Sequence, residues 1–162
     1  MTVGTKKVKQ HILPASSMEN ERCLTVIRYG AQNAGKKAYI QAGLHADEAP
    51  GFVVMYHLMN MLDQADAAKT IDGRIILVPV ANPIGVSQWR DETLQGRFDF
   101  FNSINFNRRH LDMTAQIADR IKDRLHETPE ENVALIRKAA GEVLGSMAPK
   151  DEAEYLKHQL LS

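Results

Sequence analysis

The chain has 162 residues, with 20 Lys and Arg balanced by 20 Asp and Glu, and 44% of its residues are hydrophobic. A chain of this length can bury the core of one domain, and the composition is ordinary for a soluble globular protein. The formal net charge of zero argues against a nucleic-acid partner, because a nucleic-acid surface normally carries a basic excess.

The sequence predicts neither a membrane span nor an export signal. It lacks a run of about 18 apolar residues, and no apolar stretch follows the basic N-terminal residues. The single cysteine, Cys23, excludes an internal disulfide, and these features together predict a cytoplasmic protein with no membrane partner. Cys23 lies in a β-rich run, which favours a small buried apolar residue over a nucleophile.

Strands are predicted first along the chain. Residues 8–13 and 23–29 are short β-rich runs, and the polar residues 18–21 between them predict a hairpin. A third strand is expected at 38–42, after a loop that contains glycines.

A strand–helix–strand unit begins with this third strand. Pro50 suits the first turn of a helix, and residues 52–62 are apolar on nearly every side, which predicts a well-buried helix. Residues 74–80 form a nearly continuous apolar strand, typical of a sheet covered on both faces. The order strand, helix, strand predicts a right-handed crossover and parallel pairing.

Residues 81–110 have no clear period and are rich in Asn, Gly, Asp and Arg. A loop this long in a compact domain is usually functional or disordered. Its aromatic residues predict an ordered, packed loop, and they are Trp89, Phe98, Phe100, Phe101 and Phe106.

The C-terminal third predicts helices. One carries an apolar stripe at four-residue spacing from Met113 to Leu125, and the next begins in a capping box formed by Thr128 and Glu131. A last helix starts near Lys150, and no stop signal follows it. We therefore expect an α/β fold with a mixed, largely parallel sheet flanked by helices, in which residues 1–162 are the N-terminal part of a single domain that continues beyond the chain.

His45 and Glu48 lie three residues apart where the third strand gives way to the helix. Ligands in open α/β sheets collect beyond the carboxyl ends of the strands, and this spacing can aim both side chains at one point. Imidazole nitrogen and carboxylate oxygen bind zinc, and a catalytic zinc usually takes three protein ligands and a water. The two residues alone also fit a surface histidine with Glu48 merely favouring the helix N-terminus.

The long loop contains candidates for binding a carboxylate. It includes the sequences NP at 82–83, GRFD at 96–99 and NFNRR at 105–109. A guanidinium fork binds a carboxylate through two hydrogen bonds. The alternative is a solvated basic loop that pairs with local acids such as Asp91 and Asp99.

Taken together, the segments at 41–51, 78–85, 96–99 and 105–108 resemble the succinylglutamate desuccinylase/aspartoacylase family, within the zinc carboxypeptidase-like superfamily. The resemblance covers residues 37–110 and implies a zinc cofactor bound by His45 and Glu48. It implies that Asn107 and Arg108 hold the substrate carboxylate and that Arg97 polarises the scissile carbonyl. Ala46 replaces the glycine that commonly follows the ligand histidine.

The family's third ligand, a histidine in an Asp-Leu-His-type motif, and its glutamate base have no counterpart here. His110, His126 and His158 are expected at the surface instead. The resemblance thus implies a zinc-dependent hydrolase of N-acyl amino acids or similar carboxylate-bearing amides, present here as an inactive fragment. The partners expected are a small substrate with a free carboxylate and a second copy of the chain in a homo-oligomer. The alternatives are a non-catalytic carboxylate-binding member and, last, a structural α/β scaffold.

Overall fold

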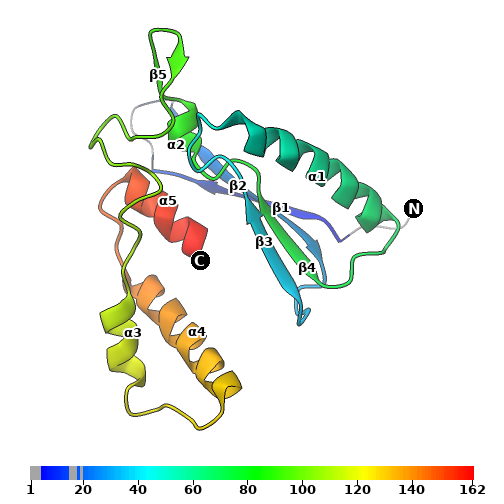
Figure 1. The fold of residues 1–162 in the computed structure, drawn as a ribbon, viewed down its shortest axis with the longest axis vertical. Helices are drawn as coiled ribbons and strands as arrows, with labels where there is room; N and C mark the ends of the chain where they lie inside the picture. Colours follow the sequence, from blue (N-terminus) through cyan, green and yellow to red (C-terminus); the bar gives the residue numbers. More distant parts are fainter. Residues whose placement is uncertain (1–4, 15–17, 19) are drawn as a thin grey trace. The chain divides into compact units, whose positions relative to one another are not determined.

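The computed structural model describes residues 5–14, 18 and 20–162, and the chain divides into two compact units, Met1–Arg109 and His110–Ser162. The first unit contains a four-stranded sheet in the order β1-β2-β4-β3 (Figure 1). Its strands are β1 (Lys7–Ile12), β2 (Cys23–Gly30), β3 (Lys37–Gln41) and β4 (Arg74–Val78).

The hairpin and the crossover are both confirmed. β1 pairs antiparallel with β2, and part of the turn predicted at 18–21 lies outside the described residues. The helix α1 (Ala49–Ala67) connects β3 to β4, which pair in parallel. Pro50 occupies its first turn, as predicted.

The sheet is mixed, but the prediction that it is largely parallel is wrong for the strands described. β2 also pairs antiparallel with β4, so only the β3–β4 ladder is parallel. The reason is topological. The second strand of the hairpin, β2, lies beside β4 and runs opposite to it, so the parallel β3–β4 pair is not extended by a further parallel strand.

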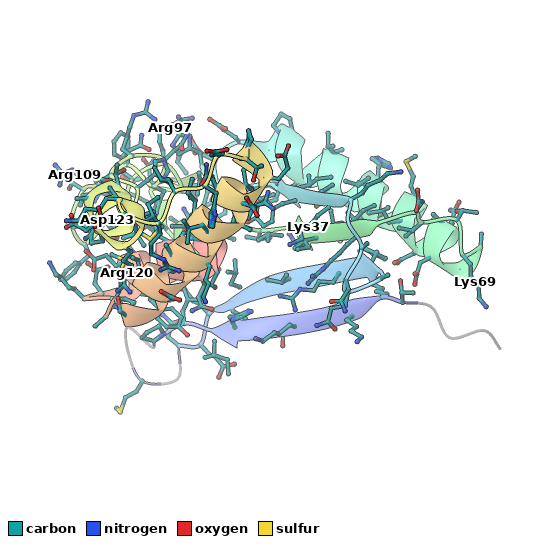
Figure 2. All side chains as sticks on the ribbon, turned by 90° about the horizontal axis from the view of Figure 1, so that it is seen from below. Lys37, Lys69, Arg97, Arg109, Arg120 and Asp123 are labelled. Carbon is teal, nitrogen blue, oxygen red and sulfur yellow. The ribbon has the colours of Figure 1, made fainter. Side chains whose placement is uncertain are left out.

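The helix α1 lies along one face of this sheet (Figures 1 and 2). The core between them consists of Ile27, Tyr29 and Leu77 from the strands and Met55 and Leu62 from the helix. The prediction of a well-buried helix is wrong, because α1 has a single covered face. Apolar residues on its other faces are 57–66% exposed, namely Val53, Val54, Tyr56 and Met61.

The long loop is ordered, as predicted, and contains α2 (Pro83–Val86) and a small hairpin of β5 (Trp89–Arg90) and β6 (Thr93–Leu94). The Gln88 side chain, 7% exposed, donates to the Gln95 and Phe98 carbonyls and accepts from the Phe100 backbone N–H. Of the loop aromatics only Phe106 is buried. Polar side chains, rather than aromatic packing, therefore order the loop.

The second unit contains the three predicted helices, α3 (Thr114–Ile121), α4 (Pro129–Ser146) and α5 (Glu152–Leu161). Thr128 is the N-cap of α4, but its hydroxyl bonds to the Glu131 carboxylate and not to the backbone, so the predicted capping box is wrong. Leu125 lies beyond the end of α3 and is 58% exposed. In the described part of the chain, no helix combines the length and the apolar character needed to cross a bilayer.

A buried tyrosine connects β2 to α1. The Tyr29 hydroxyl donates to Asp63 Oδ1 at 2.7 Å, and Lys6 Nζ lies 2.7 Å from the same oxygen. Burial, followed by the hydrogen bond to Asp63, raises the pKa of Tyr29 from 10.0 to about 12. The folded state therefore holds this proton more tightly than the unfolded state does.

We expect Tyr29→Phe to lower the free energy of unfolding at neutral pH by about 1 kcal/mol, the usual net value of one hydrogen bond. Between about pH 10 and 12 the wild type should lose stability, because its unfolded state releases the tyrosine proton first, and the variant should lose less. Urea denaturation at several pH values measures both effects. Tyr56→Phe, at a 60% exposed position on α1, is the matched control and should change neither.

Candidate metal and substrate site

The candidate site lies beyond the carboxyl ends of the parallel strands β3 and β4. Backbone pairing continues past these strands, since the Ala42 N–H donates to the Val78 carbonyl at 3.1 Å and the Ala81 N–H to the Ala42 carbonyl at 2.8 Å. The turns that follow the two strands are thereby brought together. This is the edge at which open α/β sheets bind ligands.

Two small structural features fix the turn between β3 and α1. Gly43 has φ +68°, and a Cβ there would come within 2.3 Å of the Phe52 ring, so the turn requires glycine. Asn82, fully buried, donates from Nδ2 to the Leu44 carbonyl at 3.0 Å and accepts from the Gly85 N–H at 2.8 Å. Asn82 thus joins the start of α2 to the backbone beside His45.

The hydrogen bonds around His45 define its tautomer. Its Nε2 lies 2.8 Å from Asn105 Oδ1, and that oxygen also accepts the Asn107 backbone N–H at 2.8 Å. An atom that accepts from a backbone N–H is the amide oxygen, so His45 Nε2 must be the donor. The lone pair of His45 is therefore on Nδ1, on the opposite side of the ring.

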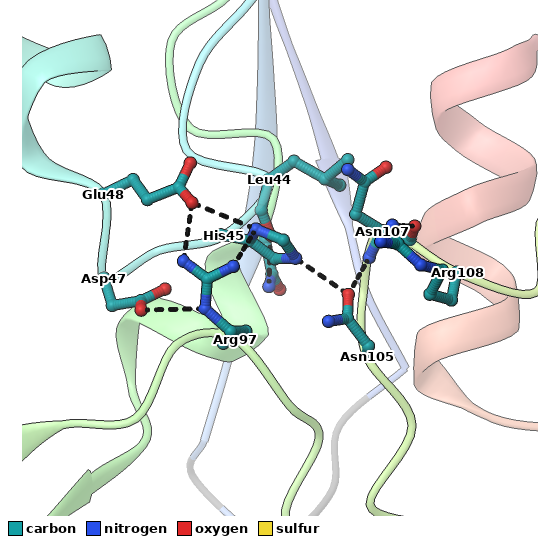
Figure 3. A network of polar contacts seen from close by, with 9 residues as sticks. Leu44, His45, Asp47, Glu48, Arg97, Asn105, Asn107 and Arg108 are labelled. Atoms are coloured by element: carbon teal, nitrogen blue, oxygen red, sulfur yellow. Dashed lines mark hydrogen bonds and ion pairs between the residues drawn. The ribbon is translucent and has the colours of Figure 1, made fainter.

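The lone pair of Nδ1 and the Glu48 carboxylate face the same guanidinium (Figure 3). His45 Nδ1 and Glu48 Oε1 are 3.2 Å apart. One terminal nitrogen of Arg97 lies 3.0 Å from Nδ1, and the other donates to Glu48 Oε1 at 2.6 Å. The Arg97 Nε donates to Asp47 Oδ2 at 3.3 Å, which completes the guanidinium's set of partners in this cluster.

The charges in this cluster keep Glu48 ionised. The hydrogen bond from Arg97 is the main cause that lowers the pKa of Glu48 below its ordinary value. The same pairing with Glu48 raises the pKa of Arg97. A neutral imidazole and a carboxylate thus present two lone pairs to one positive group.

These two residues fit a zinc ion in donor type and in direction. Zinc binds neutral imidazole nitrogen and carboxylate oxygen, and a second hydrogen bond commonly orients a ligand histidine. Here Asn105 provides that bond. The Arg97 guanidinium, a cation, already contacts both His45 Nδ1 and Glu48 Oε1. No group of three His, Cys, Asp or Glu suited to a metal occurs among the residues that the structure describes.

A cavity of about 630 Å³ opens beside these side chains and is lined by residues 41–45 and 47–51 and by Asn107. Its volume lies in the range of small-molecule sites. Arg108 donates to the Asn107 carbonyl at 2.7 Å and is exposed. His45, Glu48 and Asn107 therefore line one cavity. Arg97 contacts His45 and Glu48 but is not among the lining residues, and Arg108 contacts the backbone of its neighbour.

The remaining histidines and the cysteine lie outside this cluster. His110 and His126 are exposed, as predicted. His158 is half-buried instead, and its Nε2 donates to the Leu144 carbonyl at 2.7 Å. Cys23 is half-buried rather than buried, and burial followed by the nearby Glu21 raises the pKa of its thiol, which disfavours the nucleophilic thiolate.

Sequence reasoning missed the residues that support the ligands. Asn105 and Asn82 belong to sequence motifs, but the sequence did not indicate their roles. Asn105 contacts His45, 60 positions away, and Asn82 contacts the Leu44 carbonyl, 38 positions away. Gly96 was also missed. Its carbonyl accepts the Ala46 N–H at 2.9 Å, and a Cβ on it would lie 2.5 Å from the Ala46 Cβ and 2.7 Å from the Asp47 nitrogen.

We expect Gly96→Ala to push the Arg97 loop away from the ligand turn, because the added methyl meets backbone atoms. The free energy of unfolding should fall by about 1–3 kcal/mol, and NMR should show the Arg97–Glu48 ion pair weakened. Gly35→Ala is the control, since a Cβ there has open space, and it should change stability by less than about 0.5 kcal/mol. Equal effects of the two substitutions would contradict the close packing at Gly96.

Comparison with known proteins identifies a family for the chain. The profile of the succinylglutamate desuccinylase/aspartoacylase catalytic domain matches residues 34–140, which is 107 of the 162 residues. No curated protein matches the chain in sequence.

Two solved structures are similar over most of the chain. A succinylglutamate desuccinylase/aspartoacylase family protein of Shewanella amazonensis is 28% identical with a TM-score of 0.72, and the match covers 95% of this chain and 42% of that one. A protein of Shewanella frigidimarina, assigned to the same group, is 24% identical with a TM-score of 0.79, and the match covers 98% of this chain and 43% of that one. This second likeness supports the fold. The chain spans less than half the length of these proteins. By its sequence profile, the chain belongs to the succinylglutamate desuccinylase/aspartoacylase catalytic domain family.

Proposed function

We propose that this chain carries part of the active site of a zinc-dependent hydrolase that removes the acyl group from N-acyl amino acids or similar carboxylate-bearing amides. The family supports a hydrolase of the deacylase type in general. The observation that carries the zinc proposal is the convergence of His45 Nδ1 and Glu48 Oε1, 3.2 Å apart, on one cationic group.

In this proposal His45 and Glu48 hold the metal. A bound zinc would polarise the substrate carbonyl and lower the pKa of its water towards about 7. Asn105 orients the His45 ring with the lone pair on Nδ1, because the Asn105 side chain accepts from Nε2. Glu48 adds negative charge, which its lowered pKa preserves at mildly acid pH.

The substrate roles fall to the loop residues. Asn107 lines the cavity and can donate its side-chain amide to a carboxylate, and Arg108 would pair with the same carboxylate once its bond to the Asn107 carbonyl is exchanged. Arg97 would stabilise the developing oxyanion. This role requires its guanidinium to leave Glu48 and turn towards the substrate, so Arg97 would alternate between the ligand pair and the reacting carbonyl.

Among the residues that the structure describes, no third His, Cys, Asp or Glu joins His45 and Glu48 in a group suited to a metal. We therefore propose that the chain alone binds zinc weakly and does not turn over substrate, and that residues 1–162 are the N-terminal part of one catalytic domain. The same observation favours one alternative, a non-catalytic member that binds carboxylates. The single cysteine fits a reducing compartment such as the cytoplasm.

Zinc binding and hydrolysis test the proposal. We expect calorimetry on this chain to detect weak zinc binding that His45→Ala lowers at least tenfold, because half of the protein donor set is lost. His57→Ala, at an exposed histidine on α1, is the matched control and should leave the affinity unchanged. Any longer reading frame that contains the chain should bind zinc stoichiometrically and hydrolyse acetyl- or succinyl-amino acids.

The outcomes separate the alternatives. Stoichiometric zinc and turnover by the 162 residues alone would contradict the expectation of ligands outside the chain. Carboxylate binding without zinc in the longer protein would leave the non-catalytic alternative standing. Equal zinc affinities for the His45→Ala and His57→Ala variants would contradict the ligand role of His45.

A further inference from the structure

A second cavity, of about 440 Å³, lies in the first unit away from the metal and substrate site. Four of the residues that line it are basic, namely Lys6, Lys7, Arg28 and Arg74. Arg74 begins β4 and Gly30 ends β2, whereas the candidate active site follows the ends of β3 and β4. The two cavities are therefore at opposite ends of the β4 strand.

The register of the strands places the charges together. Side chains alternate between the faces of a strand, and Tyr29 packs in the core beside α1, so Arg28 projects from the other face. Lys7 is the partner of Arg28 across the β1–β2 ladder, and Arg74 is the partner of Gly30 across the β2–β4 ladder. Three cationic side chains thus surround the position of Gly30.

Gly30 lines the cavity and lies against the backbone of Gly73. It has φ +81°, and a Cβ there would lie 2.0 Å from the Gly73 carbonyl oxygen, so no larger residue fits. Its N–H donates to the Thr5 hydroxyl at 2.7 Å, which fixes the start of the described chain beside the cavity. The backbone conformation at Gly30 is therefore fixed by its close approach to Gly73.

The described residues provide no counterion for these charges in the cavity, because none of those that line it carries a carboxylate. Lys6 pairs with Asp63, and Arg74 donates to the Gln32 carbonyl at 2.9 Å, but Lys7 and Arg28 have no ion pair within the described ranges. The Arg28 Nε is buried and has no hydrogen-bond acceptor.

This arrangement is unfavourable without an anion. Like charges directly opposite each other on neighbouring strands are destabilising, and Lys7 and Arg28 are such a pair. An oxyanion in the cavity would neutralise the charge on Lys7, Arg28 and Arg74 together. Guanidinium groups bind phosphate and carboxylate oxygens through paired hydrogen bonds.

We propose that this cavity, lined by Lys7, Arg28, Gly30 and Arg74, is a binding site for a small multivalent oxyanion of the phosphate-ester type. Three cations without an ion pair among the described residues favour an anion with two or more charges, and a cavity of about 440 Å³ has room for a small molecule. The zero formal net charge of the chain also argues against a nucleic-acid surface. The site is independent of the hydrolase proposal, because it shares no residue with the cavity beside His45.

Inorganic pyrophosphate is the probe that tests this site. We expect pyrophosphate to raise the melting temperature of the chain above the effect of sodium chloride at equal ionic strength. It should also shift the NMR signal of the Arg28 Nε–H group. Arg28→Gln should lower the affinity at least tenfold, and Arg74→Gln serves as a second variant if the first fails to fold.

Lys9→Gln is the matched control, since Lys9 shares the sheet face and strand of Lys7 but does not line the cavity. It should bind pyrophosphate as the wild type does. Equal losses of pyrophosphate affinity in the Lys9→Gln and Arg28→Gln variants would mean that pyrophosphate only screens the positive charge of the surface, and this result would overturn the proposal. Stabilisation of the wild type no greater than that by sodium chloride, or binding of a single-stranded oligonucleotide without binding of pyrophosphate, would also overturn it.

Discussion

The candidate active site depends on one electrostatic arrangement, in which an imidazole lone pair and an ionised carboxylate face the same positive group. His45 Nδ1 and Glu48 Oε1 both contact Arg97, at 3.0 and 2.6 Å. Three neighbouring residues hold these groups in place. Asn105 fixes the protonated side of the ring, Asn82 fixes the turn backbone, and Gly96 allows the Arg97 loop to approach Ala46.

In the proposed enzyme, the same arrangement would link metal binding to substrate binding. A guanidinium and a metal ion would compete for the same two lone pairs and repel each other. Zinc bound by His45 and Glu48 would therefore release Arg97 from Glu48, and the freed guanidinium would be available for a substrate oxygen. In the proposed enzyme, Arg97 would thus stabilise the turn that contains His45 and Glu48 when no metal is bound, and would act on the substrate when the metal is bound.

Much of the first unit could be predicted because its signals are local. The β-rich runs predicted β1 and β2, and the spacing of strand, helix and strand predicted the parallel β3–β4 pair. The convergence of His45 and Glu48 followed from their spacing at a helix start. The partners Asn105 and Asn82 could not be predicted, because their contacts depend on how a long loop returns to the turn.

The errors have a common physical origin. An apolar segment such as α1 does not reveal which of its faces will be covered, and Val54 is 65% exposed although the pattern predicted burial. Strand direction at β2–β4 depends on which strand inserts beside β4, which no local pattern encodes. The Thr128–Glu131 spacing likewise permitted a capping box, but the two side chains bond to each other.

The most direct measurement is the nitrogen chemical shifts of the His45 ring with and without zinc. If the lone pair faces the metal position, the metal-free protein carries the ring proton on Nε2, and zinc perturbs Nδ1 much more strongly than Nε2. A proton on Nδ1 in the metal-free protein, or a zinc effect centred on Nε2, would contradict the convergence of His45 and Glu48 on one cation.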